Sequence, residues 1–341
     1  GECHIGLVAK ELSPEEIAAD PIDPGFIAAD TREWESFIKN DVFNIVERRD
    51  LPQGVKPMTW RKVRTYKHED PLDAGRITRR KTRVVVHGFK DGRLDSGLKV
   101  DSPTIALSNL RLLISSGLQR GWEAKTFDIS TAFLRGTHID GQVFIEPDSI
   151  LRKLMGLKDG QVLQLKSTVY GLADAPREWY LEARRVLEVL GFEISRVDPA
   201  LFLFFEYLPE VKEAKSTRDV VEDRLSAFLG AREHTLREYW EDTKPRKLKG
   251  YIGLHVDDGL VMGDQAFLTG PFQKFREKFE ILELTSSPMK YLGGVVNQDS
   301  SGITLDYTHH GEKLKIVTVP TGADGLQLDD DTALNPRAHT D

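Results

Sequence analysis

The chain has 341 residues, of which 40% are hydrophobic and 30% charged, so it is long enough for one large domain or for two to three smaller modules. It has no run of about 18 apolar residues and no basic stretch followed by an apolar core at its start, which argues against a membrane span and a secretory signal. Cys3 is the only cysteine, which excludes a disulfide framework and favours a reducing compartment, and the net charge of −7 argues mildly against a nucleic-acid partner if charge is spread evenly.

The N-terminal segment predicts two amphipathic elements. Residue 1 is not methionine, so we expect a piece cut from a longer chain. The run SPEE at 13–16 has the pattern of a capping box with proline at the first helical position. The stretch TREWESFIKNDVFNIVER at 31–48 is the second amphipathic element, with Trp34, Ile38 and Phe43 on its apolar side.

A strongly basic segment lies between Arg61 and Arg83. It has nine lysines and arginines against Glu69, Asp70 and Asp73, a local charge of +6 in a chain that is acidic elsewhere. Such a segment can neutralise phosphates while the rest of the protein stays anionic. A solvated basic hairpin without a ligand is the alternative, and charge alone does not separate the two.

The middle of the chain predicts a mixture of strands, helices and loops. The β-branched run TRVVVHGF at 82–89 predicts a strand, and DGRLDSG at 91–97 predicts a loop. A helix is predicted at 102–121, with a leucine-rich core face and Gly121 at its end. Further strands are predicted at 123–130, 142–147, 161–172 and 199–205, and a further helix at 175–191.

The C-terminal part contains one segment of different character, at 206–249. It is dense in charge and predicts a surface insertion that splits one sheet, with helical or disordered portions. The sequence after it predicts a hairpin at 251–263, a helix at 270–281, strands at 289–296 and 302–308, and a loose acidic tail. The pair His309 and His310 has no third ligand at suitable spacing, so it predicts no metal site.

Two adjacent carboxylates, Asp257 and Asp258, lie between the apolar runs of GLHVDDGLVMGD. Because Asp-Gly is a strong tight-turn signal, the simplest structure is a β-hairpin that presents both carboxylates at its turn. Taken alone, this pair favours a structural turn over a metal site, since aspartates are common in turns.

A third carboxylate changes that balance. Asp128 ends an apolar strand in EAKTFDISTAFLRG, where its burial is costly unless a cation offsets the desolvation. Three carboxylates from two strand ends can hold a pair of divalent cations roughly 3.5–4 Å apart, as phosphoryl transfer requires. Oxygen ligands of this kind select Mg²⁺ or Mn²⁺ over Zn²⁺. Asp128, Asp257 and Asp258 are therefore candidates for holding such a pair of ions.

Taken in order, the motifs resemble the reverse transcriptase domain of copia-type LTR retrotransposon Pol polyproteins. TFDISTAFLRG resembles that family's DVKTAFLNG, STVYGLADAPREWY resembles SLYGLKQAPRQWY, and LHVDDGLVMGD resembles LYVDDMLLAG. KTRVVVHGF resembles KARLVARGF, DSPTIALSNLRLL resembles FSPVVRFTSIRLLL, and MKYLGGVV resembles the FLGI strand. The agreement runs in order from about residue 30 to about residue 310, which makes it more specific than any single motif.

The resemblance implies a right-hand polymerase fold of the α+β class. Fingers and palm are expected, with an antiparallel palm sheet packed on helices, and the thumb is expected to be reduced or missing. The implied division is an N-terminal segment (1–29), a fingers-like region with basic strands (30–125), a palm part with the first catalytic and the template-side motifs (126–205), the charged insertion (206–249), a palm hairpin with the following helix and strands (250–318), and the loose acidic tail (319–341).

The resemblance also implies the residues of the catalytic centre. Asp128, Asp257 and Asp258 would carry the two catalytic metals, and Ile129 and Ser130 would offer backbone groups to the metal and the triphosphate. Phe133 would pack under the nucleotide sugar, where its ring rejects a 2′-OH. A plain core phenylalanine is the alternative for Phe133.

Further residues are implied around this centre. Lys81 and Arg83 would bind the incoming phosphates, with surface charge as the alternative for Lys81. Tyr170 and Gly171 would lie on the template side beneath the nascent base pair, where glycine permits close backbone approach, although Tyr170 could equally be a core residue. His255 stands where the family usually has tyrosine, beside the primer terminus.

The start of the 175–191 helix contains residues to which we assign no catalytic role. Arg177 and Trp179 are interpreted as structural. Ala173 and Asp174 replace the family's usual Lys-Gln pair, which predicts an inverted local charge near the template.

The leading hypothesis is an RNA-directed DNA polymerase module that transfers nucleotides from dNTPs to a primer 3′-OH with two Mg²⁺ or Mn²⁺ ions. The expected partners are an RNA or DNA template–primer and other Pol modules, with no membrane, and integrase and ribonuclease H motifs are absent from this chain. The expected location is intracellular, in cytoplasmic virus-like particles or the nucleus. The alternative is a catalytically dead, truncated retroelement relic that keeps nucleic-acid binding. A metal-dependent phosphohydrolase of unrelated fold would need a nucleophile or histidine ligands that the sequence does not supply.

Overall fold

The computed structural model describes residues 24–67, 79–136, 139, 141–208, 245–292, 294–299 and 302–308. The predicted capping box, most of the charged insertion, the pair His309 and His310 and the acidic tail lie outside these residues. Within the described residues, no helix combines the length and the hydrophobicity that a bilayer crossing requires.

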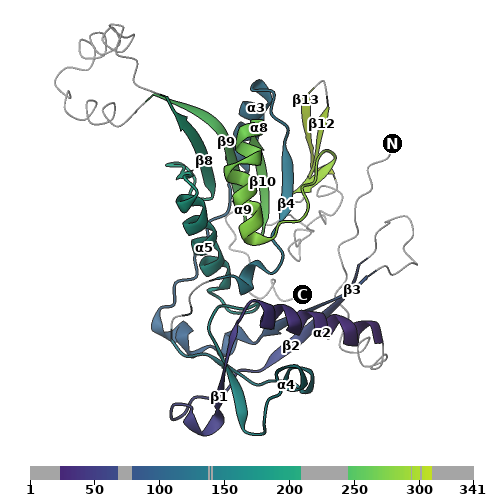
Figure 1. The fold of residues 1–341 in the computed structure, drawn as a ribbon, viewed down its shortest axis with the longest axis vertical. Coiled ribbons are helices and arrows are strands. Elements are labelled where there is room, and N and C mark those ends of the chain that lie inside the picture. The colour runs from purple at the N-terminus through teal and green to yellow at the C-terminus, as the bar shows by residue number, and fades with distance from the viewer. Residues whose placement is uncertain are drawn as a thin grey trace, which may run out of the picture.

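The fold is a mixture of helices and antiparallel sheets, arranged in two lobes (Figure 1). The first, which we call the hairpin lobe, contains a three-stranded sheet of order β1-β6-β5 and the separate two-stranded β2–β3 hairpin. Its elements are α2 (Pro24–Lys39), β1 (Phe43–Glu47), β2 (Trp60–Lys67), β3 (Arg79–Val86), β5 (Phe144–Ile145), α4 (Ser149–Met155) and β6 (Gln161–Leu165). Strands β5 and β6 pair within this lobe, although the division made from the sequence places them with residues 126–205.

The second, which we call the sheet lobe, is built on a five-stranded antiparallel sheet of order β4-β10-β9-β8-β7. Its strands are β4 (Lys125–Asp128), β7 (Glu193–Ile194), β8 (Leu201–Tyr207), β9 (Arg246–His255) and β10 (Asp258–Gly263). Its helices are α3 (Leu107–Gln119), α5 (Ala175–Val189), α8 (Gln265–Thr269) and α9 (Pro271–Phe279). The chain then forms a three-stranded sheet from β11 (Met289–Tyr291), β12 (Gly294–Asp299) and β13 (Gly302–Asp306).

Short 3-10 helices complete the connections. They are η1 (Arg48–Asp50), η2 (Gly88–Lys90), η3 (Gly92–Ser96) and η4 (Ala132–Leu134). The loop predicted at 91–97 is thus mostly a 3-10 turn, which Asp91 begins by accepting a hydrogen bond from the backbone N–H of Arg93.

Both faces of the five-stranded sheet are covered. Alternate residues of each strand point to opposite faces, so each strand contributes side chains to two cores. One face packs against α5, α8 and α9, with Phe127, Trp179 and Phe275 among its buried side chains. The other face packs against α3 and the β11–β13 sheet, with Leu260 and Met262 in that core. Covering both faces fixes the register of β4, β9 and β10, since a slip of one residue would exchange the two cores.

The amphipathic stretch at 31–48 is divided between a helix and a strand. Helix α2 ends at Lys39, and Asp41 follows with φ of +52°, a left-handed conformation that stops the helical path. Phe43 therefore lies on β1 and packs beside Trp34 of α2, with ring centroids 6.3 Å apart. Ile38 is 38% exposed, so the apolar face of α2 is made by Trp34 and Phe37 instead.

Candidate active site

The two adjacent aspartates lie at the end of the β9–β10 hairpin, as the sequence predicts. The predicted Asp-Gly turn is wrong, however, because the two turn residues are Val256 and Asp257. Asp258 already belongs to β10 and pairs with His255, and Gly259 pairs with Leu254. A side chain at Gly259 would collide with the ring of Phe127, 2.1 Å from its Cζ, so this glycine serves packing and not the turn.

Asp128 lies directly opposite Asp258, because β4 and β10 are antiparallel neighbours. Residues paired in this way project from the same face of the sheet. His255 is the residue opposite Asp258 on the other side, so β4, β9 and β10 place these three side chains in one row. Asp257 adjoins the row in the turn, and its carbonyl accepts a hydrogen bond of 2.9 Å from the backbone N–H of Ile129. The structure thus brings the three predicted aspartates together.

The predicted role of Ile129 is restricted by that hydrogen bond. Its side chain is 1% exposed and its N–H is bound to Asp257, so only its carbonyl group remains for a ligand. Ser130, the next residue, is exposed beside the same strand end. Thr131 follows with φ of +60° and turns the chain into η4, where Phe133 lies.

The three aspartates influence one another electrostatically. Partial burial and the charges of Asp257 and Asp128 together raise the pKa of Asp258 to about 6. Burial disfavours the charged form of this carboxyl group, and two nearby negative charges disfavour it as well. A divalent cation would reverse this balance, because it favours the ionised form of each carboxylate.

The donor set fits Mg²⁺ or Mn²⁺ in its chemistry, since it offers carboxylate oxygens and the Ile129 carbonyl and neither sulfur nor a cluster of imidazoles. Within the described residues, no group of three or more His, Cys, Asp or Glu side chains stands in a geometry ready to hold a metal ion. The backbones of Asp128, Asp257 and Asp258 are therefore adjacent, while their carboxylates do not converge on one point.

Phe133 and Tyr170 are neighbours at the junction of the two lobes, with ring centroids 5.2 Å apart. Phe133 is partly buried and packs against the hydrophobic cores of both lobes. The guanidinium of Arg83 lies 5.6 Å from the centre of the Tyr170 ring. Burial raises the pKa of Tyr170, as do the charges of Glu33, Asp257 and Asp128, so the phenol lies within electrostatic reach of these carboxylates. Three residues predicted separately from the sequence are thus neighbours.

Gly171 permits a close approach to another part of the backbone, that of β3. Its φ is +97°, and a Cβ atom there would lie 2.2 Å from the carbonyl oxygen of Val86 on β3. The adjoining carbonyl of Tyr170 accepts a hydrogen bond of 2.9 Å from the N–H of Val86. Glycine is required here because two backbones touch, which fixes β3 against the template-side motif.

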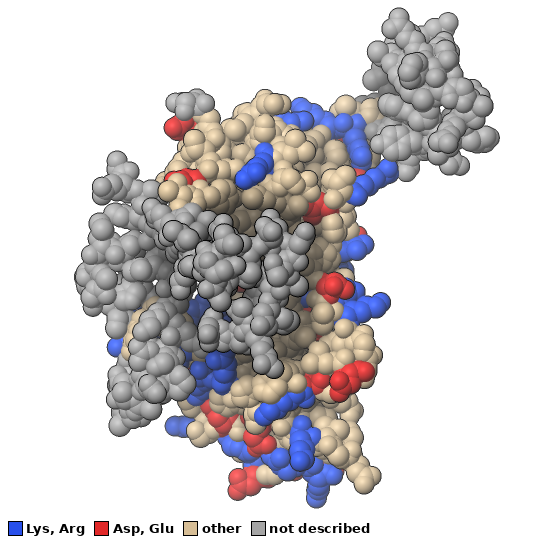
Figure 2. Space-filling view, turned by 180° about the vertical axis from the view of Figure 1, so that it is seen from behind, with Lys and Arg blue, Asp and Glu red and all other residues tan. Residues whose placement is uncertain are grey.

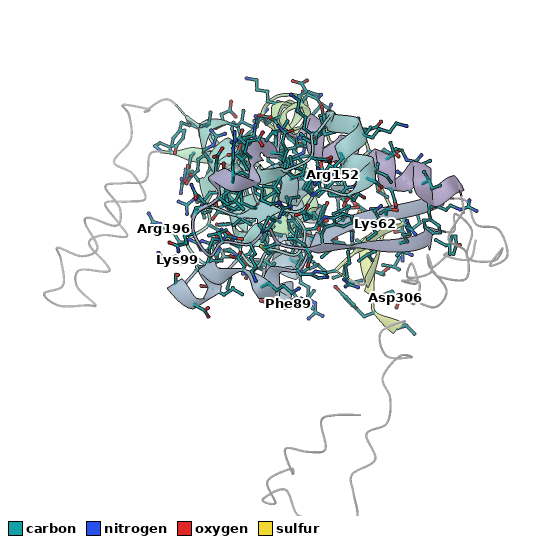
Figure 3. All side chains as sticks on the ribbon, turned by 90° about the horizontal axis from the view of Figure 1, so that it is seen from below. Lys62, Phe89, Lys99, Arg152, Arg196 and Asp306 are labelled. Atoms are coloured by element: carbon teal, nitrogen blue, oxygen red, sulfur yellow. The ribbon has the colours of Figure 1, made fainter. Side chains whose placement is uncertain are left out.

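The basic hairpin divides its charges between two faces. Lys62 and Arg64 point toward α2, where each lies 2.7 Å from Oδ2 of Asp30, a residue only 1% exposed. Burial raises the pKa of Asp30, but hydrogen bonds from Arg64, Lys62 and Thr82 outweigh it and leave the pKa below its usual value. Figure 3 labels Lys62 on this hairpin and the exposed Phe89 at the edge of the molecule. These two cations are thus committed to a buried network and do not contribute to a phosphate-binding surface.

Lys81 and Arg83 lie on the opposite face of the hairpin, because they alternate with Thr82 and Val84 along β3. Glu33 of α2 is close to both, and its Oε1 accepts a hydrogen bond of 3.2 Å from the backbone N–H of Val84. Burial raises the pKa of Glu33, while the charges of Lys81 and Arg83 oppose that rise. Glu33 is a site residue that sequence reasoning missed, since no motif marks it and only the packing of α2 on β3 brings it here.

Asp174, which is predicted to invert the local charge near the template, is bound to an arginine in the core. It is 2% exposed and accepts hydrogen bonds from both terminal nitrogens of Arg93, at 2.8 and 3.2 Å. Asp91 binds the same guanidinium at 2.7 Å, so Arg93 lies between two buried carboxylates and offsets one of their two charges. On the face seen in Figure 2, basic and acidic side chains are mixed rather than gathered into a patch of one sign.

Comparison with known proteins identifies similar sequences for part of this chain. Residues 40–209 match the family model described as reverse transcriptase (RNA-dependent DNA polymerase), a match that ends before the β9–β10 hairpin. The retrovirus-related Pol polyprotein from transposon TNT 1-94 of Nicotiana tabacum is 26% identical over 200 residues, which are 58% of this chain and 14% of that polyprotein. The corresponding polyproteins from transposons RE1 and RE2 of Arabidopsis thaliana are each 31% identical over 129 residues, 38% of this chain and 9% of theirs. The chain thus spans a small part of the relatives it matches.

Proposed function

Residues 40–209 belong to the reverse transcriptase family found in the Pol polyproteins of copia-type plant retrotransposons, and we propose that this chain is an RNA-directed DNA polymerase module. In this proposal it transfers nucleotides from dNTPs to the 3′-OH of a primer. The hairpin lobe acts as the fingers and the sheet lobe as the palm of a right-hand polymerase with a reduced or missing thumb.

One observation carries the proposal: the pairing of β4 with β10, which brings Asp128 beside Asp258 and the turn that contains Asp257. These residues are about 130 positions apart in the sequence, and nothing in a structural turn requires that strand to end in a carboxylate. The raised pKa of Asp258, caused by burial and by the other two carboxylates, supports a site that is completed by cations.

In the proposed mechanism, Asp128, Asp257, Asp258 and the carbonyl of Ile129 hold two Mg²⁺ or Mn²⁺ ions. Such ions lower the pKa of a hydroxyl nucleophile and stabilise the charge that develops on the transferred phosphoryl group. The chain itself provides the geometry: the β4–β10 ladder and the Ile129 N–H fix the backbone from which the carboxylates project. His255, which pairs with Asp258, would contact the primer end.

The nucleotide would occupy the space bounded by Phe133, Tyr170 and β3. Arg83 and Lys81 would bind its phosphates, since a guanidinium suits bidentate contact with phosphate oxygens. Phe133 would pack under the sugar and reject a 2′-OH. Gly171 holds the template-side segment against β3, so the phosphate-binding and template-binding parts would move as one unit.

The test is primer extension on poly(rA)/oligo(dT) with Mg²⁺ and with Mn²⁺. Wild type is expected to extend the primer, and Asp257→Asn is expected to lose extension by at least about 100-fold, because removing a metal-binding charge removes transition-state stabilisation. The matched control is Asp50→Asn, an exposed aspartate in η1, which should keep wild-type activity. Undiminished extension by Asp257→Asn would remove that residue from the site.

A second candidate function is a nucleic-acid-binding relic without catalysis. It is favoured by His255 in place of a tyrosine next to Asp258 and by carboxylates that do not converge on a metal position. This candidate predicts salt-sensitive binding of template–primer with no incorporation in any divalent metal. Extension in a preparation free of other polymerases, abolished by Asp257→Asn, excludes it.

A further inference from the structure

The turn that contains Asp257 is held by a side chain from outside the hairpin. The indole N–H of Trp179, on α5, donates a hydrogen bond of 2.7 Å to the carbonyl oxygen of Val256. The next carbonyl, that of Asp257, accepts from the N–H of Ile129. Both carbonyls of the two-residue turn are therefore fixed, one by α5 and one by the end of β4.

This turn needs such support because of its own conformation. Val256 has φ of +58°, a left-handed conformation that β-branched residues rarely adopt. Residues held in such regions persist only where the surroundings determine them. The hydrogen bond of Trp179 acts on this residue, directly before the two aspartates.

We propose that Trp179 is a positioning residue of the catalytic centre, which holds Val256 in its left-handed conformation and thereby sets the direction of Asp257 and Asp258. The inference rests on the proposed polymerase function for its catalytic consequence, but not for its structural content. It assigns a role to a residue that the sequence suggests is merely structural.

The surroundings of Trp179 separate its hydrogen bond from its packing. The ring is 1% exposed and meets Phe279 of α9 edge to face, with centroids 5.0 Å apart. A phenylalanine at 179 keeps an aromatic ring in this core and removes the N–H donor. Because a buried tryptophan N–H normally finds an acceptor, the loss also leaves the Val256 carbonyl without its partner.

The first measurement is steady-state primer extension by Trp179→Phe. We expect kcat to fall about tenfold with KM for dNTP changed less than about twofold, since the affected groups act in the transition state and not in substrate binding. Trp122→Phe is the matched control, because Trp122 is 8% exposed in the core on the other face of the sheet. Its kcat should stay within about twofold of wild type.

The second measurement is a rescue. Asparagine adopts the left-handed conformation more readily than valine, so Val256→Asn makes the turn less dependent on Trp179. In the Trp179→Phe background, Val256→Asn should recover kcat by about threefold or more, a coupling that independent sites do not have. A role of Trp179 in packing alone predicts no recovery.

The third measurement does not depend on catalysis or on metal. Amide hydrogen exchange in EDTA should accelerate about tenfold at residues 256–259 in Trp179→Phe, with β8 unchanged, because only the turn is released. Uniform acceleration across β8, β9 and β10 would overturn the inference, as would a kcat within twofold of wild type. If wild type extends no primer, the proposed function fails, and the exchange pattern alone decides whether Trp179 holds the turn.

Discussion

Neutralising Asp258 should stabilise the metal-free protein at neutral pH. Burial and the charges of Asp257 and Asp128 raise the pKa of Asp258 from 3.8 to about 6. A raised pKa in the folded state means that the contribution of this group to stability is present below about pH 4 and is lost as pH rises through about 6. Asparagine at 258 does not ionise and keeps a similar shape, so Asp258→Asn avoids that loss.

The magnitude follows from the shift. Two pKa units correspond to about 2.7 kcal/mol, and since Asp258 is partly exposed, solvent screening reduces this to about 1–1.5 kcal/mol. For a chain of this size we expect Asp258→Asn to raise Tm by about 2–5 °C at pH 7.5 in EDTA. At pH 4 the two proteins should unfold at nearly the same temperature, because wild-type Asp258 is then protonated.

Thermal unfolding of both proteins at pH 4 and pH 7.5 measures the difference. Addition of Mg²⁺ at pH 7.5 should then stabilise wild type more than Asp258→Asn, because a ligand that binds the folded state more tightly adds more stability at the same concentration. A variant less stable than wild type at pH 7.5 in EDTA, or a difference independent of pH, would show that the three carboxylates do not repel one another as described.

Three further predictions concern the packing around the site. Asp30→Asn should lower the free energy of unfolding in urea by about 3–5 kcal/mol, because Lys62 and Arg64 lose a buried partner. Asp41 is an exposed partner of Lys166, so Asp41→Asn should lower it by less than about 1 kcal/mol. Equal losses of stability in the two variants would contradict the buried network. Gly171→Ala should destabilise the protein by at least about 2 kcal/mol more than Gly54→Ala, because both glycines have positive φ but only Gly171 touches another backbone. Equal effects of the two substitutions on Tm would exclude that contact. Glu33→Gln should bind inorganic tripolyphosphate about threefold more tightly than wild type in calorimetry at low salt, because a negative charge near Lys81 and Arg83 is removed. Glu35 is exposed, and Glu35→Gln should bind tripolyphosphate like wild type. Weaker binding by Glu33→Gln would show that the phosphates bind elsewhere.

Local pattern predicted most elements of this fold but not their pairing. The helices at 107–119 and 175–189 and the strands at 125–128 and 258–263 follow from periodicity and from glycine at their ends. The division of 31–48 into α2 and β1 did not follow, because the sequence stays amphipathic through Asp41, where a single backbone conformation ends the helix. The turn predicted at Asp258-Gly259 was wrong for a related reason. Asp-Gly has the composition of a turn, but glycine is needed at 259 because the ring of Phe127 occupies the space of a side chain.

The site shows the same limit. Each aspartate was predicted from its own motif, and their adjacency depends on the pairing of β4 with β10, a long-range contact that resemblance implies but no local pattern contains. Glu33 and Trp179 were missed as site residues because their roles depend on where α2 and α5 pack. The basic segment was overcounted, since Lys62 and Arg64 are indistinguishable from Lys81 and Arg83 until Asp30 is located.

The contrast between two groups of carboxylates explains which of them belongs to a site. Asp30 is almost fully buried, yet its pKa is lowered, because Arg64, Lys62 and Thr82 satisfy its charge within the fold. Asp258 is less buried, yet its pKa is raised, because its near neighbours Asp257 and Asp128 are also acidic. The charge of Asp30 is satisfied within the fold and serves structure, whereas the carboxylates of Asp257 and Asp128 raise the pKa of Asp258. The hydrogen bonds of Ile129 and Trp179 and the β4–β10 ladder fix the backbone that carries these aspartates, and in the proposed function a bound cation would relieve the repulsion between them.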